Sequence, residues 1–81
     1  MAQQDIVKLS DTERQAFTDA YRFYERHHAM PNTVEAWEKC SDDVKQIIEK
    51  YEGPVKAFVC SLLVVLYEAI ERRCRDEAKE Q

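Results

Sequence analysis

A nearly unbroken apolar run at residues 57–67 constrains the fold of this chain more than any other feature of the sequence. It is Ala-Phe-Val-Cys-Ser-Leu-Leu-Val-Val-Leu-Tyr, within a chain in which 35% of the residues are charged. The run is far shorter than the roughly 20 residues that a bilayer-spanning helix needs, which excludes a transmembrane protein. Most of it must therefore be buried, either against the rest of the chain or against a partner.

The totals favour one small helical domain. A chain of 81 residues is long enough for a single core of marginal stability. One Gly and two Pro among 44% hydrophobic residues suit long helices with few tight turns. We therefore expect an N-terminal arm over residues 1–9 and a single all-α domain over residues 10–81, folded as a three-helix bundle.

Cysteine count and the N-terminal sequence indicate a cytoplasmic protein. Three cysteines cannot all pair within one chain, which favours a reducing compartment. The start, Met-Ala-Gln-Gln-Asp, lacks the basic flank and apolar stretch of a secretion signal. Cys40 and Cys60 fall on apolar helix faces, so Cys74, near the charged end of the chain, is the thiol expected to meet an oxidant.

The first helix is predicted over residues 11–28. Ser10 and Glu13 have the spacing of a capping box, and Pro31 disfavours helical backbone at the residue before it. At 100° per residue, six apolar side chains share one side of this helix and are expected to face the core. They are Ala16, Phe17, Ala20, Tyr21, Phe23 and Tyr24.

The second helix is predicted over residues 33–52, with Asn32 or Thr33 as its N-cap. Ser41, followed by two aspartates, resembles a further N-cap and raises the alternative of a break there. The apolar stripe nevertheless keeps its phase across that point, which favours one continuous helix with Asp42 and Asp43 on its solvent side. The stripe consists of Trp37, Cys40, Val44, Ile47 and Tyr51.

The third helix is predicted over residues 54–78, with Pro54 at its first position. Its apolar arc covers roughly 220°, more than two neighbours in a three-helix bundle can cover. We therefore expect a homodimer that forms largely through this helix, antiparallel or crossed about a two-fold axis. The predicted interface residues are Phe58, Leu62, Val65, Leu66, Tyr67 and Ala69.

Two alternatives would give a monomer. The N-terminal arm, with Ile6, Val7 and Leu9, could fold back over the surplus apolar surface. A break at Ser41 could instead supply a fourth helix that covers it. The arm is short and the phase argument disfavours the break, so the sequence favours the dimer.

No candidate site in the sequence carries catalysis. Glu25 and His28 have the Glu-x-x-His spacing of di-iron bundles, but Glu25 falls on the polar side of its helix. His27 and His28 suit a helix C-terminus, and neither a positioned serine nucleophile nor a Gly-rich phosphate loop accompanies them. We therefore expect neither an enzyme nor a bound cofactor or metal.

Protein partners are expected in place of catalysis. Trp37 lies beside acidic residues of the second helix, and a large aromatic in that setting suits a partner contact. The predicted contact residues are Trp37, Glu38 and Asp42. The sequence thus predicts a self-associating interaction or accessory module.

Nucleic-acid binding is the alternative function. A dimer could use Arg22, Arg26 and the basic end from Arg72 to Arg75 against phosphates. The net charge of −4 and the acidic residues among these arginines oppose it. Nucleic acid is therefore not the expected partner.

Scattered helix-packing residues resemble a family of small proteins encoded in prophages and integrative elements of Firmicutes. The resemblance rests on Pro31-Asn32-Thr33, Trp37, Tyr51 and the Leu-Tyr-Glu-Ala-Ile-Glu-Arg-Arg segment that ends at Arg73, and it covers roughly residues 17–73. It implies a helical fold and a bacterial, mobile-element setting. It implies no activity and no site residues.

Overall fold

The computed structural model describes residues 9–79, which form three helices and no strand. Helix α1 spans Asp11–His27, α2 spans Val34–Glu49 and α3 spans Pro54–Lys79. The all-α, three-helix architecture is thus as predicted. Of the predicted N-terminal arm, only Leu9 lies within the described residues, and its side chain is exposed.

Local signals place the helix starts as expected. The side chain of Ser10 accepts from the Glu13 amide at 3.1 Å, and the Glu13 carboxylate accepts from the Ser10 amide at 2.9 Å, which completes the capping box. Thr33 is the N-cap of α2. Gly53 adopts a φ of 68°, which favours glycine, and Pro54 directly follows it as the first residue of α3.

Helix α2 continues through Ser41 without a break, so the phase of the apolar stripe predicted this correctly. It ends at Glu49, three residues before the predicted end. The amides of Lys50 and Tyr51 turn to the carbonyls of Ile47 and Ile48, three residues back, at 3.1 Å each. This tightening ends the helix and leaves Tyr51 free to turn toward α1. Helix α1 ends one residue earlier than predicted and α3 one residue later.

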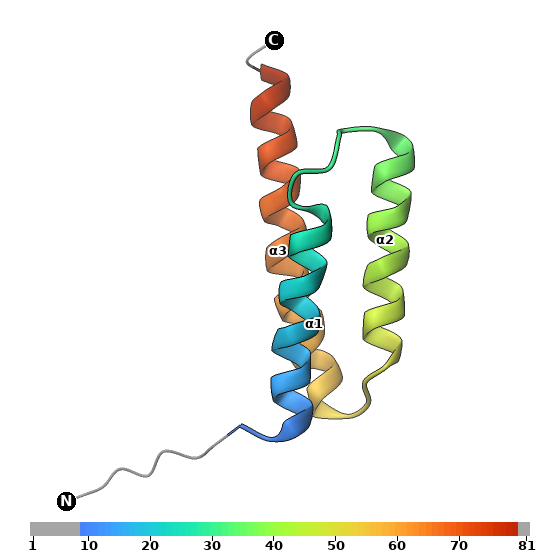
Figure 1. Cartoon of the computed structure of the whole chain (residues 1–81), viewed down its shortest axis with the longest axis vertical. Helices are drawn as coiled ribbons and strands as arrows, with labels where there is room; N and C mark the ends of the chain where they lie inside the picture. The colour runs from blue at the N-terminus through green and yellow to red at the C-terminus, as the bar shows by residue number, and fades with distance from the viewer. Residues whose placement is uncertain (1–8, 80–81) are drawn as a thin grey trace, which may run out of the picture.

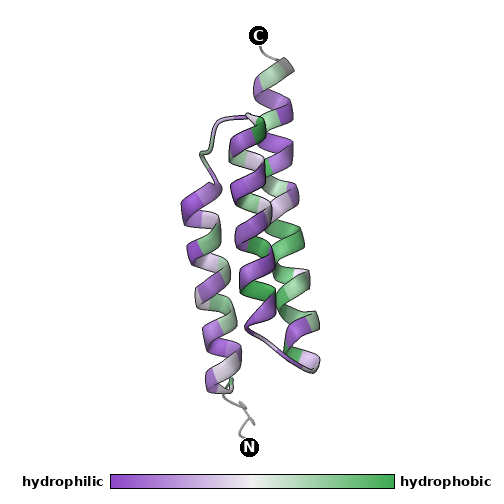
Figure 2. Ribbon diagram, turned by 90° about the vertical axis from the view of Figure 1, so that its right-hand side faces the viewer, coloured by the Kyte–Doolittle hydropathy of each residue, from purple (hydrophilic) through white to green (hydrophobic). Residues whose placement is uncertain are grey.

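The three helices run up, down and up, so that α1 and α3 are parallel and α2 is antiparallel to both (Figure 1). More of α1 than of α2 approaches α3 closely. Figure 2 shows α2 in front of the other two helices, with hydrophobic residues filling the middle of α3. The arrangement therefore leaves α3 flanked by α1 on one side and α2 on the other.

The core runs along the inner faces of the three helices. Phe23 and Leu63 are its largest fully buried members, together with Ile70, Val59 and Cys40. On α1 only Ala16, Ala20 and Phe23 are buried. The other three apolar residues predicted to face the core from this helix, namely Phe17, Tyr21 and Tyr24, are exposed.

Polar contacts join α1 to the end of α2. The carboxylate of Asp19 accepts from the Tyr51 hydroxyl at 2.5 Å and from Lys50 Nζ at 2.8 Å. Burial alone would raise the pKa of Asp19, but the hydrogen bonds from Lys50 and Tyr51 outweigh it and lower that pKa below the ordinary 3.8. Burial, and then the bond to Asp19, raise the pKa of Tyr51 to about 12 from 10.0.

The pKa shifts of Asp19 and Tyr51 predict that the protein loses stability at both low and high pH. Because the pKa of Asp19 is lowered on folding, its contribution is present above pH 3.8 and is lost as the pH falls through the folded-state value. Because the pKa of Tyr51 is raised, its contribution is complete below pH 10 and is lost between pH 10 and about 12. By linkage, the alkaline loss is about 2–3 kcal/mol in the free energy of unfolding.

Denaturant titrations at a series of pH values, followed by circular dichroism, measure this dependence. Tyr51→Phe removes the titrating hydroxyl and keeps the ring, so it is the matched control. Burial also raises the pKa of Cys40, to about 11, so both proteins lose some stability in alkali. The difference between them should grow smaller above pH 10, and a difference that does not change with pH would contradict the assigned role of Tyr51.

Candidate functional site

The predicted dimer residues of α3 lie on two different sides of the helix. Phe58, Leu62, Val65 and Ala69 repeat every four and three residues, so they share the stripe beside α1. Phe58 marks this side because its ring meets Phe17 of α1 edge-on, with ring centroids 5.3 Å apart. Tyr67 instead lies on the side of α2, where its ring packs at 5.1 Å from Trp37.

Helix α1 supplies three aromatic residues to the same surface. Phe17, Tyr21 and Tyr24 are 45%, 66% and 38% exposed, and they repeat every four and three residues, as Phe58, Leu62 and Val65 do on α3. Because α1 and α3 are parallel and in contact at Phe17 and Phe58, the two stripes lie side by side. Together they form an apolar surface, here called the aromatic face: Phe17, Tyr21, Tyr24, Phe58, Leu62, Val65 and Ala69.

The sequence predicted the α3 side of the aromatic face as an exposed surface, but it did not predict the α1 side. Sequence reasoning placed the α1 aromatics in the core because it treated one broad side of the helix as buried. Their spacing of four and three residues, offset from that of Ala16, Ala20 and Phe23, was the signal that could have separated them. The spacing alone does not tell which of the two stripes meets the interior.

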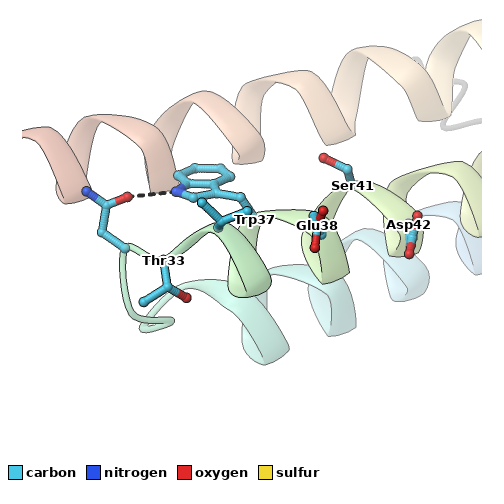
Figure 3. Close-up of a pocket in the computed structure, with 7 residues that line it drawn as sticks. Thr33, Trp37, Glu38, Ser41 and Asp42 are labelled. Carbon is cyan, nitrogen blue, oxygen red and sulfur yellow. Dashed lines mark hydrogen bonds between the residues drawn. The ribbon is translucent and has the colours of Figure 1, made fainter.

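The three predicted partner-contact residues line one open hollow of about 700 Å³ at the start of α2 (Figure 3). The Trp37 indole donates from Nε1 to Asn32 Oδ1 at 2.8 Å, while its ring is tilted against Tyr67. Glu38 and Asp42 are exposed on the following turns of α2. The hollow therefore combines a fixed, half-buried indole with two carboxylates.

A second hollow, of about 430 Å³, lies between α2 and α3. Its lining is mainly apolar and includes Val44 and Ile48 of α2 and Cys60 and Val64 of α3. Glu68 and Glu71 complete the lining on the α3 side. Val64 is 54% exposed and Val65 is 64% exposed, so these two neighbouring valines differ mainly in the direction in which their side chains point.

Asp43 does not lie on the solvent side of α2 as predicted. Its Oδ2 atom is 2.8 Å from His27 Nε2 and accepts from Arg26 Nη2 at 2.6 Å. Asp43 and His27 are largely buried, because α1 covers this side of α2. This cluster therefore links the end of α1 to the middle of α2, while Asp42 stays exposed.

Three of the five basic residues of the nucleic-acid alternative, namely Arg26, Arg73 and Arg75, are engaged within the chain. Arg26 binds Asp43, as described above. Arg73 donates to the Met30 carbonyl at 2.6 Å and to the Glu77 carboxylate at 2.8 Å, and Arg75 lies 3.5 Å from Glu71. The bond from Arg73 to Met30 holds the 28–33 loop on α3, and the carboxylates of Asp43, Glu77 and Glu71 balance part of the positive charge.

The cysteine expectation was wrong for Cys74. This thiol is 3% exposed, because the loop that Arg73 holds on α3 lies over that end of the helix. Cys40 is buried too, and burial together with Asp43 and Cys74 raises the pKa of its thiol to about 11. Cys60, predicted to be covered, is the partly exposed thiol.

The two histidines have separate environments. His27 binds Asp43, whereas His28 caps α1 and packs on Tyr24 with ring centroids 5.5 Å apart. Within residues 9–79, no group of three or more His, Cys, Asp and Glu side chains is placed to hold a metal ion. No helix in this range has the length and apolar character needed to cross a bilayer.

Comparison of the chain with protein-family models, with curated proteins and with solved structures found no match.

Proposed function

We propose that this chain is a small interaction module, acting by binding rather than by catalysis, and that it forms a homodimer through the aromatic face. The observation that carries the proposal is the exposure of Phe17, Tyr21, Tyr24 and Val65 on one continuous surface. The proposal also places the protein in the cytoplasm of a bacterium: the odd number of cysteines favours the cytoplasm, and the resemblance to mobile-element proteins implies the bacterial host.

The exposed area supports a partner on this face. Since an aromatic side chain has an area of 150–250 Å², the exposed fractions of Phe17, Tyr21 and Tyr24 leave roughly 300 Å² of ring surface in water. Val65, at 64% exposed, extends it. A patch of this size is comparable to the largest apolar patch of a typical monomer, about 300–600 Å², and such a patch is often a functional surface.

The charge distribution favours a second copy as the occupant. Two chains of net charge −4 repel each other, so a contact that brings no carboxylates close together is favoured over one that does. None of the seven residues that define the aromatic face is charged, whereas carboxylates line both hollows beside α2. A two-fold axis would pair the aromatic face with itself, the commonest symmetry in protein dimers.

Val65→Lys tests the proposal. A lysine at the centre of the aromatic face would face its own copy across the two-fold axis, so the dissociation constant should rise at least about tenfold. Size-exclusion chromatography with light scattering measures the mass. Wild type is expected to be dimeric and Val65→Lys monomeric at the same micromolar concentration.

Val64→Lys is the matched control, because Val64 has similar exposure but points toward α2. It should remain dimeric. A wild-type chain that is monomeric at micromolar concentration would reject the dimer, and dissociation by Val64→Lys but not by Val65→Lys would place the interface beside α2 instead.

A further inference from the structure

The two hollows beside α2 adjoin at one aromatic contact. Trp37 lines the hollow at the start of α2, here called the upper hollow, and Tyr67 lines the hollow between α2 and α3, here called the lower hollow. The centroids of their rings are 5.1 Å apart. The combined surface, here called the α2–α3 groove, extends along α2 from Val34 to Ile48. At 1.5 Å per residue this is about 21 Å, the length of a helix of roughly 14 residues.

The base of the α2–α3 groove is apolar. Val44 and Ile48 of α2 face Cys60, Leu63 and Val64 of α3 across the lower hollow. Less of α2 than of α1 approaches α3 closely, so the base is not closed by the two helices themselves. Such a surface between two antiparallel helices accepts the apolar stripe of a further helix.

The charges on the α2–α3 groove have one sign. Glu38 and Asp42 lie on the α2 side, and Glu68 and Glu71 on the α3 side. No lysine or arginine is among the lining residues of either hollow. Among the described residues, Glu71 has an ion-pair partner, Arg75 at 3.5 Å, whereas Glu38, Asp42 and Glu68 have none.

We propose that the α2–α3 groove binds a cationic amphipathic helix of another protein. The apolar stripe of that helix would cover Val64 and Ile48, and its lysine or arginine side chains would meet the four carboxylates. A cation above the indole of Trp37 would add a cation–π contact. A second copy of this acidic chain fits the groove poorly, so the site is independent of the dimer proposed above.

A designed peptide tests the site with the full-length chain. The probe is a Leu-Lys peptide of about 14 residues without tryptophan, with leucines at the i, i+3, i+4 and i+7 spacing. Trp37 is the only tryptophan of the chain, so its fluorescence reports directly on the groove. The proposal expects a saturable change in Trp37 emission, with an affinity that weakens as salt is added.

Three variants test whether the peptide binds in the α2–α3 groove. Val64→Lys should weaken peptide binding at least about tenfold, because it places a like charge and a hydrated group on the apolar base. The double variant Glu38→Gln with Asp42→Asn should weaken binding several-fold and reduce its salt dependence. Val65→Lys should bind the peptide as wild type does, although it is expected to lose the dimer.

The absence of saturable binding would overturn the proposal. If Val64→Lys and Val65→Lys lose the same affinity for the peptide, the proposal is also overturned. Such a result would mean that the peptide does not bind specifically on the α2 side of α3. A Leu-Glu peptide of the same pattern provides the last check. If it binds as well as the Leu-Lys peptide, the attraction is only apolar and the inferred charge recognition is wrong.

Discussion

Phe23→Ala is expected to remove most of the stability of the fold at room temperature. The ring of Phe23 is fully buried and packs 5.0 Å from the His27 ring at the centre of the α1 contacts. Truncation of such a residue removes its burial and leaves a cavity, which costs about 3–5 kcal/mol. Small domains have total stabilities of only about 5–15 kcal/mol, and a chain of 81 residues belongs at the lower end.

Denaturant titration followed by circular dichroism measures this loss, at one fixed protein concentration because self-association adds to stability. Val34→Ala is the control, since Val34 is also apolar and helical but 76% exposed. It should change the free energy of unfolding by no more than about 0.5 kcal/mol. Similar losses in the two variants would show that Phe23 does not lie in the core.

Asp43→Ala is expected to cost about 2–3 kcal/mol in the free energy of unfolding, because it removes hydrogen bonds from charged partners in a partly buried cluster. Arg26 and His27 lose their common acceptor, and His27 stays largely covered by α2. The same titration compares it with Asp42→Ala, the adjacent residue, which is exposed and expected to be near neutral.

The Asp42 and Asp43 pair is informative because the two substitutions are chemically identical. If both variants lose the same free energy, the loss does not depend on the contacts of Asp43, and the cluster with Arg26 and His27 does not stabilise the fold. A loss confined to Asp43→Ala supports the packing of α1 on α2 in the orientation described.

Local signals along the sequence were sufficient to predict the helices. The capping box at Ser10, the N-cap in the Asn32–Thr33 pair and the Gly53–Pro54 boundary act within a few residues of the chain. The continuity of α2 through Ser41 followed from the phase of its apolar stripe. These features depend on short-range chemistry, which the sequence contains directly.

The errors concern contacts between helices. Asp43 was assigned to solvent because periodicity describes one helix at a time, whereas its partners are on α1. Cys74 was expected to be exposed, but the loop that Arg73 holds covers it. The end of α2 shifted because Tyr51 is drawn to Asp19, more than 30 residues earlier in the chain.

The candidate surfaces illustrate the same distinction. The excess apolar circumference of α3 was visible in the sequence, but its division between two sides was not. Only the positions of α1 and α2 place Val65 on the aromatic face and Val64 on the α2–α3 groove. Two adjacent valines thereby separate the two proposed binding activities, one for a second copy and one for a cationic helix.

The proposed homodimer buries the aromatic face of one chain against a second copy. Sedimentation equilibrium of the unmodified protein, across the micromolar range, tests it most directly. For a homodimer we expect a mass that approaches twice the 9.6 kDa of one chain as the concentration rises. A mass that stays at 9.6 kDa throughout this range would contradict it.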